Sequence, residues 1–87
     1  MNWQVYIILC TDNSLYTGIT LDIDRRLSEH GSALGAKYFR GRKPQQVMYL
    51  ESGHTRSSAS KREAVIKRLK RTAKVALIES GKNEVII

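Results

Sequence analysis

The residue with the most unusual surroundings in this sequence is a glutamate. Glu63 is the only acid between Glu51 and Glu79, and that stretch contains eight lysines and arginines. Residues 57–78 show helical periodicity, which places Glu63 on an apolar stripe with Ile66. A carboxylate is rarely buried without a partner, and a cation, either a metal ion or an arginine, is its natural complement. The pattern therefore indicates chemistry on an anionic molecule.

Four further polar residues could converge with Glu63 on one cleft. Tyr6 and Tyr16 lie in two strand-like segments, one on each side of a turn. Arg26 and His30 are four residues apart in an expected helix, so they lie on adjacent helical turns. Both border the apolar stripe of that helix, and we expect them to point toward the sheet rather than into solvent. Each residue also has an ordinary interpretation: the tyrosines as strand aromatics, the histidine as a helix cap or surface residue.

The elements that must position these residues follow from local patterns. Alternating β-branched and aromatic residues predict strands, turn residues predict a hairpin between the first two, and helical periodicity bounded by capping residues and glycine predicts the helices. Together they predict an α+β domain, a three-stranded antiparallel sheet flanked by helices. The expected strands are 3–10, 15–20 and 46–51, the turn is 11–14, and the expected helices are 22–30 and 57–80, the latter broken near Thr72. Residues 31–43 read as a mixed segment, and residues 83–87 have no assignment.

The hairpin must meet one geometric condition if the two tyrosines act together. Side chains alternate between faces along a strand, so Tyr6 and Tyr16 share a face only if the numbers of paired residues sum to an even value. That requires a loop of odd length, for example residues 12–14. A two-residue turn at Asp12-Asn13 would place the tyrosines on opposite faces.

Composition narrows the class of protein. The chain has 87 residues, enough for one compact domain, and 41% of them are apolar. No run approaches the roughly 18 apolar residues of a membrane span. Cys10 is the only cysteine and no signal peptide is evident, so we expect a cytoplasmic protein without membrane association. There is no cluster of cysteine and histidine that would suggest zinc.

Positive charge is concentrated in the second half of the sequence. The net charge is +7, and residues 37–74 hold twelve of the fifteen lysines and arginines but only two acids. A one-sided basic surface suggests a nucleic-acid partner, the alternative being a solvated basic helix. Cations and aromatics that could meet phosphates and bases alternate beside the proposed cleft. The candidate nucleic-acid-binding residues are Lys37, Tyr38, Arg40, Arg42, Lys43 and Lys67. Tyr38 could equally be a core residue.

The order of these motifs resembles that of a known family. The segments Val5-Tyr6-Ile7, Tyr16-Thr17-Gly18-Ile19-Thr20, Arg25-Arg26-Leu27, His30 and Arg62-Glu63-Ala64 resemble the GIY-YIG nuclease domain, in particular its small stand-alone bacterial members of the UPF0213 group. The likeness covers about residues 3–75 of a single domain at 1–87. Val5 stands in place of the first glycine of the name motif, and Thr17 in place of the second isoleucine. Asn83 is the only late candidate for an asparagine that orders the site in longer members, and its spacing does not match.

The resemblance implies hydrolysis of a phosphodiester in nucleic acid, DNA rather than RNA, with branched or damaged DNA as candidate substrates. Glu63 would be the only protein ligand of one divalent metal ion, Mg²⁺ or Mn²⁺, an arrangement that suits Mg²⁺. Tyr6 and Tyr16 would position and deprotonate the attacking water. Arg26 would hold the scissile phosphate, and His30 would relay a proton or contact the phosphate. A salt bridge to Arg26 or a nearby lysine is the alternative role of Glu63.

Two other functions explain part of the sequence. A non-catalytic nucleic-acid-binding module would keep the fold and the charge, and a basic accessory protein of RNA or ribosomes would explain the charge alone. Neither gives a reason for retaining all five polar residues. Cleavage of both strands of a duplex would require two copies, so a homodimer is one arrangement that the sequence leaves open. Of the neighbouring residues, Arg25 should turn away from the apolar stripe and His54 should be a surface residue.

Overall fold

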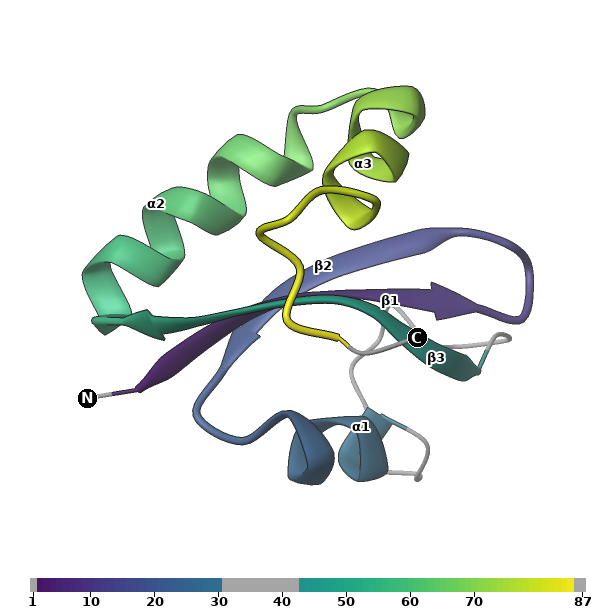
Figure 1. The fold of residues 1–87 in the computed structure, drawn as a ribbon. Coiled ribbons are helices and arrows are strands. Elements are labelled where there is room, and N and C mark those ends of the chain that lie inside the picture. Colours follow the sequence, from purple (N-terminus) through teal and green to yellow (C-terminus); the bar gives the residue numbers. More distant parts are fainter. Residues whose placement is uncertain (1, 31–42, 86–87) are drawn as a thin grey trace.

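The chain forms one antiparallel sheet with helices on both faces, in a computed structural model that describes residues 2–30 and 43–85. In chain order its elements are β1 (Trp3–Cys10), β2 (Leu15–Thr20), α1 (Ile23–His30), β3 (Pro44–His54), α2 (Arg56–Lys67) and α3 (Arg71–Ile78). The strand order is β2-β1-β3. Figure 1 shows α1 on one face of the sheet and α2 with α3 on the other. The predicted α+β class and three-stranded antiparallel sheet are confirmed.

The β1–β2 hairpin meets the condition on the two tyrosines. The paired residues include Tyr6 with Gly18 and Ile8 with Tyr16, so the numbers of each pair sum to an even value and both tyrosines lie on one face. The Cys10 amide donates to the Ser14 carbonyl at 2.9 Å and closes the turn. Within the turn Asn13 has a φ of 68°, a left-handed conformation that asparagine tolerates better than most residues.

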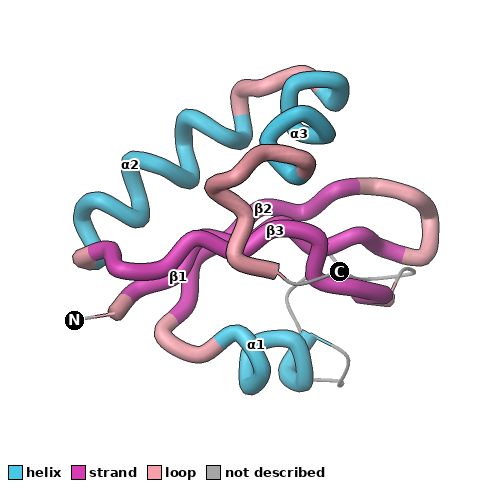
Figure 2. The backbone as a smooth tube through the Cα atoms, in the orientation of Figure 1, coloured by secondary structure: helices cyan, strands magenta, loops and turns pink. Residues whose placement is uncertain are grey.

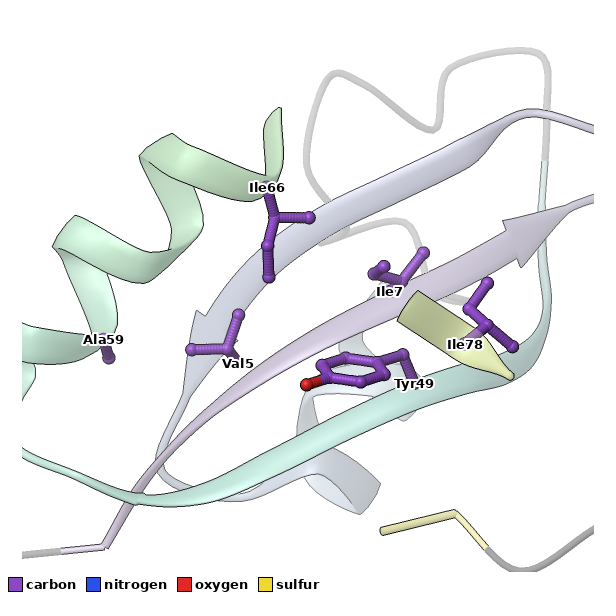
Figure 3. Close-up of a cluster of buried hydrophobic side chains, with 6 residues drawn as sticks. All are labelled: Val5, Ile7, Tyr49, Ala59, Ile66 and Ile78. Atoms are coloured by element: carbon purple, nitrogen blue, oxygen red, sulfur yellow. The ribbon is translucent and has the colours of Figure 1, made fainter. Parts of the chain in front are cut away.

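Strand β1 lies in the centre of the sheet and is buried on both faces, which explains its almost continuous apolar sequence. Its odd-numbered residues pack under α2 and α3, and its even-numbered residues pack under α1. Figure 3 shows the first cluster, in which the Tyr49 ring lies on the face of the sheet that α2 and α3 cover. That cluster comprises Val5, Ile7, Tyr49, Ala59, Ile66 and Ile78; the second comprises Tyr6, Ile8 and Cys10, with Tyr16, Ile23 and Leu27 beside them.

Strand β3 is longer than the predicted strand at 46–51. It runs from Pro44, which pairs with Cys10, to His54, which pairs with Trp3, so it spans the full length of β1. Three register shifts interrupt the pairing, and such bulges let a strand continue past residues that do not alternate regularly. The prediction was too short because pairing with β1, rather than local composition, sets the ends of β3.

The predicted helical segment 57–80 consists of two helices. Helix α2 begins after Thr55, which accepts a hydrogen bond from the Ser58 amide while the Ser58 hydroxyl accepts one from the Thr55 amide. The break lies at residues 68–70, between Lys67 and Arg71, rather than near Thr72. None of the helices in residues 2–30 and 43–85 has the length and apolar character needed to cross a membrane.

The C-terminal tail covers the outer edge of β3. The Glu84 amide donates to the Leu50 carbonyl at 2.9 Å, and the Asn83 side chain donates to the carbonyls of Met48 and Ile78, both at 2.8 Å. Figure 2 shows this segment as a loop that returns from α3 toward the sheet. Asn83 therefore anchors the tail at β3, on the opposite side of the sheet from β2. Among the described residues β2 pairs with β1 only, and its other side is called the β2 edge below.

Candidate active site

The Tyr6 side chain reaches across the sheet because Gly18 has no side chain. Tyr6 on β1 pairs with Gly18 on β2, and a Cβ atom at Gly18 would lie 2.4 Å from the Tyr6 hydroxyl and 2.6 Å from Cζ. The ring therefore lies directly over the Gly18 backbone, and its hydroxyl points from the central strand toward the β2 edge. The Tyr16 ring is next to it, with ring centroids 6.2 Å apart and planes inclined by 44°.

Helix α1 brings an arginine to the Tyr6 hydroxyl. Asp22 caps the helix by accepting a hydrogen bond from the Arg25 amide at 3.2 Å, and the Gln4 side chain on β1 accepts one from the Ile23 amide at 3.0 Å. Ile23 and Leu27 pack on the sheet in the cluster of Tyr6. This orientation leaves Arg26 half-buried and Arg25 exposed, as the periodicity of the helix predicted.

The ionisation of Tyr6 reflects groups from three elements. Burial raises the pKa of Tyr6 to about 12, a hydrogen bond from the Arg26 guanidinium opposes that increase, and the charges of Tyr16 and Glu63 add to it. Tyr6 is therefore a neutral phenol at neutral pH. Arg26 and Glu63 act on the same hydroxyl although their helices pack on opposite faces of the sheet. The β2 edge is where the two faces meet.

Glu63 lies at the margin of the buried face of α2. Ala59 and Ile66 on the same helix are fully buried, while the Glu63 side chain is 25% exposed. Its carboxylate Oε2 is 3.6 Å from the Lys67 ammonium, one turn later. This ion pair is the lysine alternative considered for Glu63, and an exposed pair of this kind contributes little stability. A small ligand can therefore reach the carboxylate, and its binding would break only the weak ion pair with Lys67.

Two cavities open along the β2 edge. The larger, of about 400 Å³, lies at the end of β2, where Arg25, Arg26 and Arg56 line it together with Trp3. The Arg56 guanidinium lies over the Trp3 ring, 5.7 Å from its centroid, which holds the arginine beside the cavity. The smaller cavity, of about 310 Å³, lies nearer the hairpin turn and is lined by Leu15, Tyr16, Thr17, Lys67 and Lys74. Cations therefore lie beside both cavities along this edge.

The donor groups at the edge fit a metal ion that is held mainly by water and substrate. No three residues of histidine, cysteine, aspartate or glutamate within the described segments could bind a metal together. The charge of the Glu63 carboxylate contributes to the raised pKa of Tyr6, so this carboxylate lies within electrostatic reach of the tyrosine pair. A single partly exposed carboxylate suits Mg²⁺, which keeps several waters and combines one or two carboxylates with phosphate oxygens.

A second polar network lies between β3 and α2, and it corrects the prediction for His54. Glu51 accepts hydrogen bonds from the Tyr49 hydroxyl at 2.6 Å and from the Arg62 guanidinium at 3.2 Å. His54 Nε2 is 2.5 Å from the same carboxylate, and its Nδ1 is 2.8 Å from the Ser58 hydroxyl. His54 is therefore a half-buried member of the network that joins β3 to α2, rather than a free surface residue.

The remaining predicted residues fall into two groups. Lys43 and Lys67 are described: both are exposed, and the main chain of Lys43 bonds to Thr11 near the hairpin turn. The side chain of His30, at the end of α1, lies outside the described part of the structure, and so do four basic and aromatic candidates. Those four are Lys37, Tyr38, Arg40 and Arg42, all within residues 31–42.

Sequence reasoning did not identify all residues at the β2 edge. The sequence pattern assigned no role at the site to Thr17, which it identified only as standing in place of an isoleucine, and none to Arg56. The signal for Thr17 was present, because strand alternation places it on the opposite face from Tyr16 and so toward α2. Arg56 is part of the edge because β3 extends to His54, which pairs with Trp3, and α2 therefore begins beside Trp3.

Comparisons with known proteins follow the same outline. Residues 2–76 match the family model described as the GIY-YIG catalytic domain. The chain is 50% identical over 80 residues to a UPF0213 protein of Desulfotalea psychrophila, covering 91% of this chain and 73% of that protein. It is 51% identical over 77 residues to a UPF0213 protein of Haloquadratum walsbyi, covering 88% and 86% respectively.

Two solved structures are also similar. The solution NMR structure of a UPF0213 protein from Bacillus halodurans has a TM-score of 0.60 and 39% identity, covering 97% of this chain and 89% of that one. The solution NMR structure of a protein from E. faecalis has a TM-score of 0.64 and 40% identity, covering 91% and 84%. The comparison by sequence and the comparison by structure therefore both find UPF0213 proteins.

Proposed function

Because this chain belongs to the GIY-YIG nuclease family, we propose that it is a metal-dependent endonuclease that hydrolyses phosphodiester bonds in DNA. The observation that carries the proposal is the convergence at the Tyr6 hydroxyl. The Tyr6 hydroxyl lies over Gly18, and the Tyr16 ring on β2 lies beside the Tyr6 ring with centroids 6.2 Å apart. The Arg26 guanidinium on α1 donates a hydrogen bond to this hydroxyl, and the charge of Glu63 on α2 reaches it. Beside the buried Tyr6, the half-buried Arg26 and Tyr16 and the partly exposed Glu63 are accessible from the edge. An arginine, a phenol and a carboxylate in this arrangement are suited to binding a phosphate and activating water.

In this proposal Arg26 binds the scissile phosphate. Its guanidinium offers parallel donors that match two phosphate oxygens, and it is positively charged at every relevant pH. Half-burial of Arg26 strengthens its attraction for charge that develops on the phosphate during the reaction. Its contact with Tyr6 also brings the phosphate beside the phenol, within reach of a water molecule.

Tyr6 and Tyr16 hold and deprotonate that water. In the protein alone, burial raises the pKa of Tyr6 to about 12, so this phenol keeps its proton at neutral pH. A phenol becomes a base when positive charge is placed beside it. Arg26 supplies part of that charge. The half-buried Tyr16 lies next to Tyr6 and is open to solvent, so it can orient the water.

Glu63 would hold a divalent ion, Mg²⁺ or Mn²⁺, in exchange for its contact with Lys67. When bound, such an ion stabilises negative charge on the phosphate and lowers the pKa of bound water. With one carboxylate the affinity for the ion alone is expected to be weak, and phosphate oxygens of the substrate would complete the site. Glu63 fits this arrangement because its carboxylate is partly exposed and lies 3.6 Å from the Lys67 ammonium, a long distance for an ion pair.

The charge of the chain supports a nucleic-acid substrate. Lysines and arginines from α1, α2 and α3 line both cavities of the β2 edge, in a protein with a net charge of +7. Contacts of this kind bind the backbone without reading the bases. We therefore expect recognition of DNA structure, such as branches or damage, rather than of a base sequence.

The test compares the wild type with Glu63→Gln, a change that removes the charge and keeps the shape. Glu79→Gln is the matched control, because Glu79 is exposed and lies just after α3, away from both cavities. Nicking of supercoiled plasmid and cleavage of a branched oligonucleotide are measured with Mg²⁺, Mn²⁺ or EDTA, and binding is measured in parallel.

We expect cleavage by the wild type and Glu79→Gln in the presence of either metal. We expect no cleavage by Glu63→Gln or in EDTA, with DNA binding retained in both cases. Cleavage that persists in Glu63→Gln would refute the metal-site assignment. Binding without cleavage by the wild type under every metal would refute the nuclease proposal itself.

The second candidate function is a non-catalytic module that binds nucleic acid. The observation that favours it is the ion pair between Glu63 and Lys67, which leaves the carboxylate with a protein partner. In such a module Glu63 would orient Lys67 toward the nucleic acid. Glu63→Gln would then weaken binding, whereas the nuclease proposal expects binding to be retained, so the same experiment separates the two functions.

A further inference from the structure

The smaller cavity of the β2 edge contains a buried hydroxyl group to which no described residue makes a hydrogen bond. Thr17 is only 2% exposed, and its Oγ1 has no hydrogen-bond partner within the described part of the chain. Thr17 also lines the cavity of about 310 Å³. Buried hydroxyl groups are usually hydrogen-bonded, because leaving one unsatisfied costs about 1–3 kcal/mol. A ligand in the cavity would satisfy it.

The main chain of Thr17 provides a second donor at the same place. The bond between Cys10 and Ser14 closes the first hydrogen-bonded pair of the hairpin. In an antiparallel ladder such pairs alternate, so Tyr16 and Gly18 bond to β1 while the Thr17 amide points away from it. The Thr17 N–H therefore lies on the β2 edge, beside its own side chain.

Two lysines add positive charge to these donors. Lys67 on α2 is 53% exposed and Lys74 on α3 is half-buried, and both line the cavity. Glu63 balances Lys67 at 3.6 Å, so the charge of Lys74 is in excess. Its half-buried position reduces the screening of that charge by solvent. The cavity thus combines ammonium groups, an amide and a hydroxyl, a set that binds an anion rather than a cation.

We propose that this cavity binds a phosphate of the nucleic-acid backbone, next to the phosphate that is cut. The proposal rests on the nuclease function above. Lys67 connects the two places, because it contacts Glu63 and also lines the cavity. Tyr16 connects them as well, since it lies beside Tyr6 and lines the same cavity. A strand that follows the β2 edge would place one phosphate at Arg26 and a neighbouring one at Thr17 and Lys74.

The first test uses two variants and a matched control. Thr17→Val removes only the hydroxyl. Because no described residue makes a hydrogen bond to that hydroxyl, the variant is expected to fold at least as stably as the wild type. Lys74→Ala removes the excess charge. Lys61→Ala is the control, an exposed lysine on α2 that does not line either cavity. Binding of a branched DNA oligonucleotide is measured in EDTA, so that no cleavage occurs, at several salt concentrations.

We expect Thr17→Val to weaken binding about three- to tenfold with an unchanged salt slope, as loss of one neutral hydrogen bond would. We expect Lys74→Ala to weaken binding and to reduce the slope of log K against log salt by about one. Lys61→Ala should leave the slope as in the wild type. Equal slopes in Lys74→Ala and Lys61→Ala, or wild-type affinity in Thr17→Val, would overturn the proposal.

A second measurement separates this subsite from the nuclease function. In NMR spectra of the full chain without metal, inorganic phosphate should shift the amide signal of Thr17, and the shift should be lost in Lys74→Ala. An unmoved Thr17 amide with both phosphate and the oligonucleotide would also overturn the proposal. Neither measurement requires cleavage. A protein that shows these shifts but never cleaves DNA would refute the nuclease function and retain the phosphate subsite.

Discussion

Replacement of Gly18 by alanine tests whether the position of the Tyr6 hydroxyl matters for the reaction. The added Cβ would lie 2.4 Å from the Tyr6 hydroxyl, whereas ordinary contact begins at 3.4 Å. The hydroxyl must therefore move by about 1 Å, away from the Gly18 backbone. Because Tyr6 is fully buried among Ile8 and Cys10, its ring cannot move without disturbing its neighbours.

The magnitudes follow from this displacement. Overpacking of a buried site costs about 1–3 kcal/mol, and replacing glycine in a strand returns about 0.5–1 kcal/mol. We expect a net loss of about 1 kcal/mol, a fall in Tm of roughly 4–8 °C for a domain of this size. A catalytic group displaced by about 1 Å lowers the reaction rate on the order of 100-fold. Gly18→Ala should therefore lose far more activity than stability.

The assay measures plasmid nicking with Mg²⁺ well below the Tm of the variant, together with thermal unfolding. Gly81→Ala is the matched control, since a Cβ at Gly81 has nothing within 4 Å and should change neither quantity substantially. Gly18→Ala with activity within about twofold of the wild type would refute the reasoning that Tyr6 acts from its position over Gly18. A loss of activity that only parallels the loss of folded protein would refute it equally.

Three further predictions concern the polar contacts that hold β3. Burial opposes ionisation of Glu51, but hydrogen bonds from Tyr49, His54 and Arg62 outweigh burial and lower its pKa. The contribution of Glu51 to folding stability is therefore complete above about pH 4.5 and is lost as the pH falls through the folded-state pKa. The difference in unfolding free energy between the wild type and Glu51→Gln should thus shrink between pH 5 and pH 3; a constant difference in urea titrations would contradict this. Tyr49→Phe, which removes the 2.6 Å bond to Glu51, should lower the unfolding free energy by about 1–2 kcal/mol in the same titrations. Asn83→Ala removes four bonds of the tail and should lower the Tm while leaving the rate of plasmid nicking per folded molecule unchanged; loss of nicking at full stability would instead indicate a role in the site.

Much of the sheet could be predicted from the sequence because the information is local. The bounds of β1 and β2 are as predicted, since β-branched and aromatic residues lie on both sides of a clear turn sequence. The condition on paired residue numbers is met in the structure, whereas the sequence alone left both turn lengths open. Strand β3 was cut short because its ends depend on pairing with β1 far away in the sequence. Its polar end at Ser52 and Gly53 gives no local strand signal.

The site was harder to predict than the sheet because it combines both faces. Periodicity placed Arg26 toward the sheet and Glu63 on an apolar stripe. In the structure Arg26 is half-buried, and Glu63 lies at the margin of the buried face with its side chain 25% exposed. The sequence indicated that these groups could converge on one cleft, but periodicity gave no means of predicting that α1 and α2 would lie on opposite faces of the sheet. The sequence also predicted that His54 is a surface residue. Its hydrogen bonds to Glu51 and Ser58 form where β3 ends and α2 begins, and no sequence pattern indicates such contacts.

The two edges of the sheet differ, and this difference gives a physical reason for the reaction site that we propose at β2. An edge strand exposes unpaired main-chain groups and is normally covered or protected. At β3 the tail provides the cover, through the Glu84 amide and the Asn83 side chain. Among the described residues, the same groups at β2 face two cavities lined by cations, where we propose that the outward amide of Thr17 binds a phosphate. Gly18 then lets Tyr6 reach that edge from the central strand. In the proposed nuclease, one glycine and one edge that no described residue covers would bring groups from opposite faces to the same substrate.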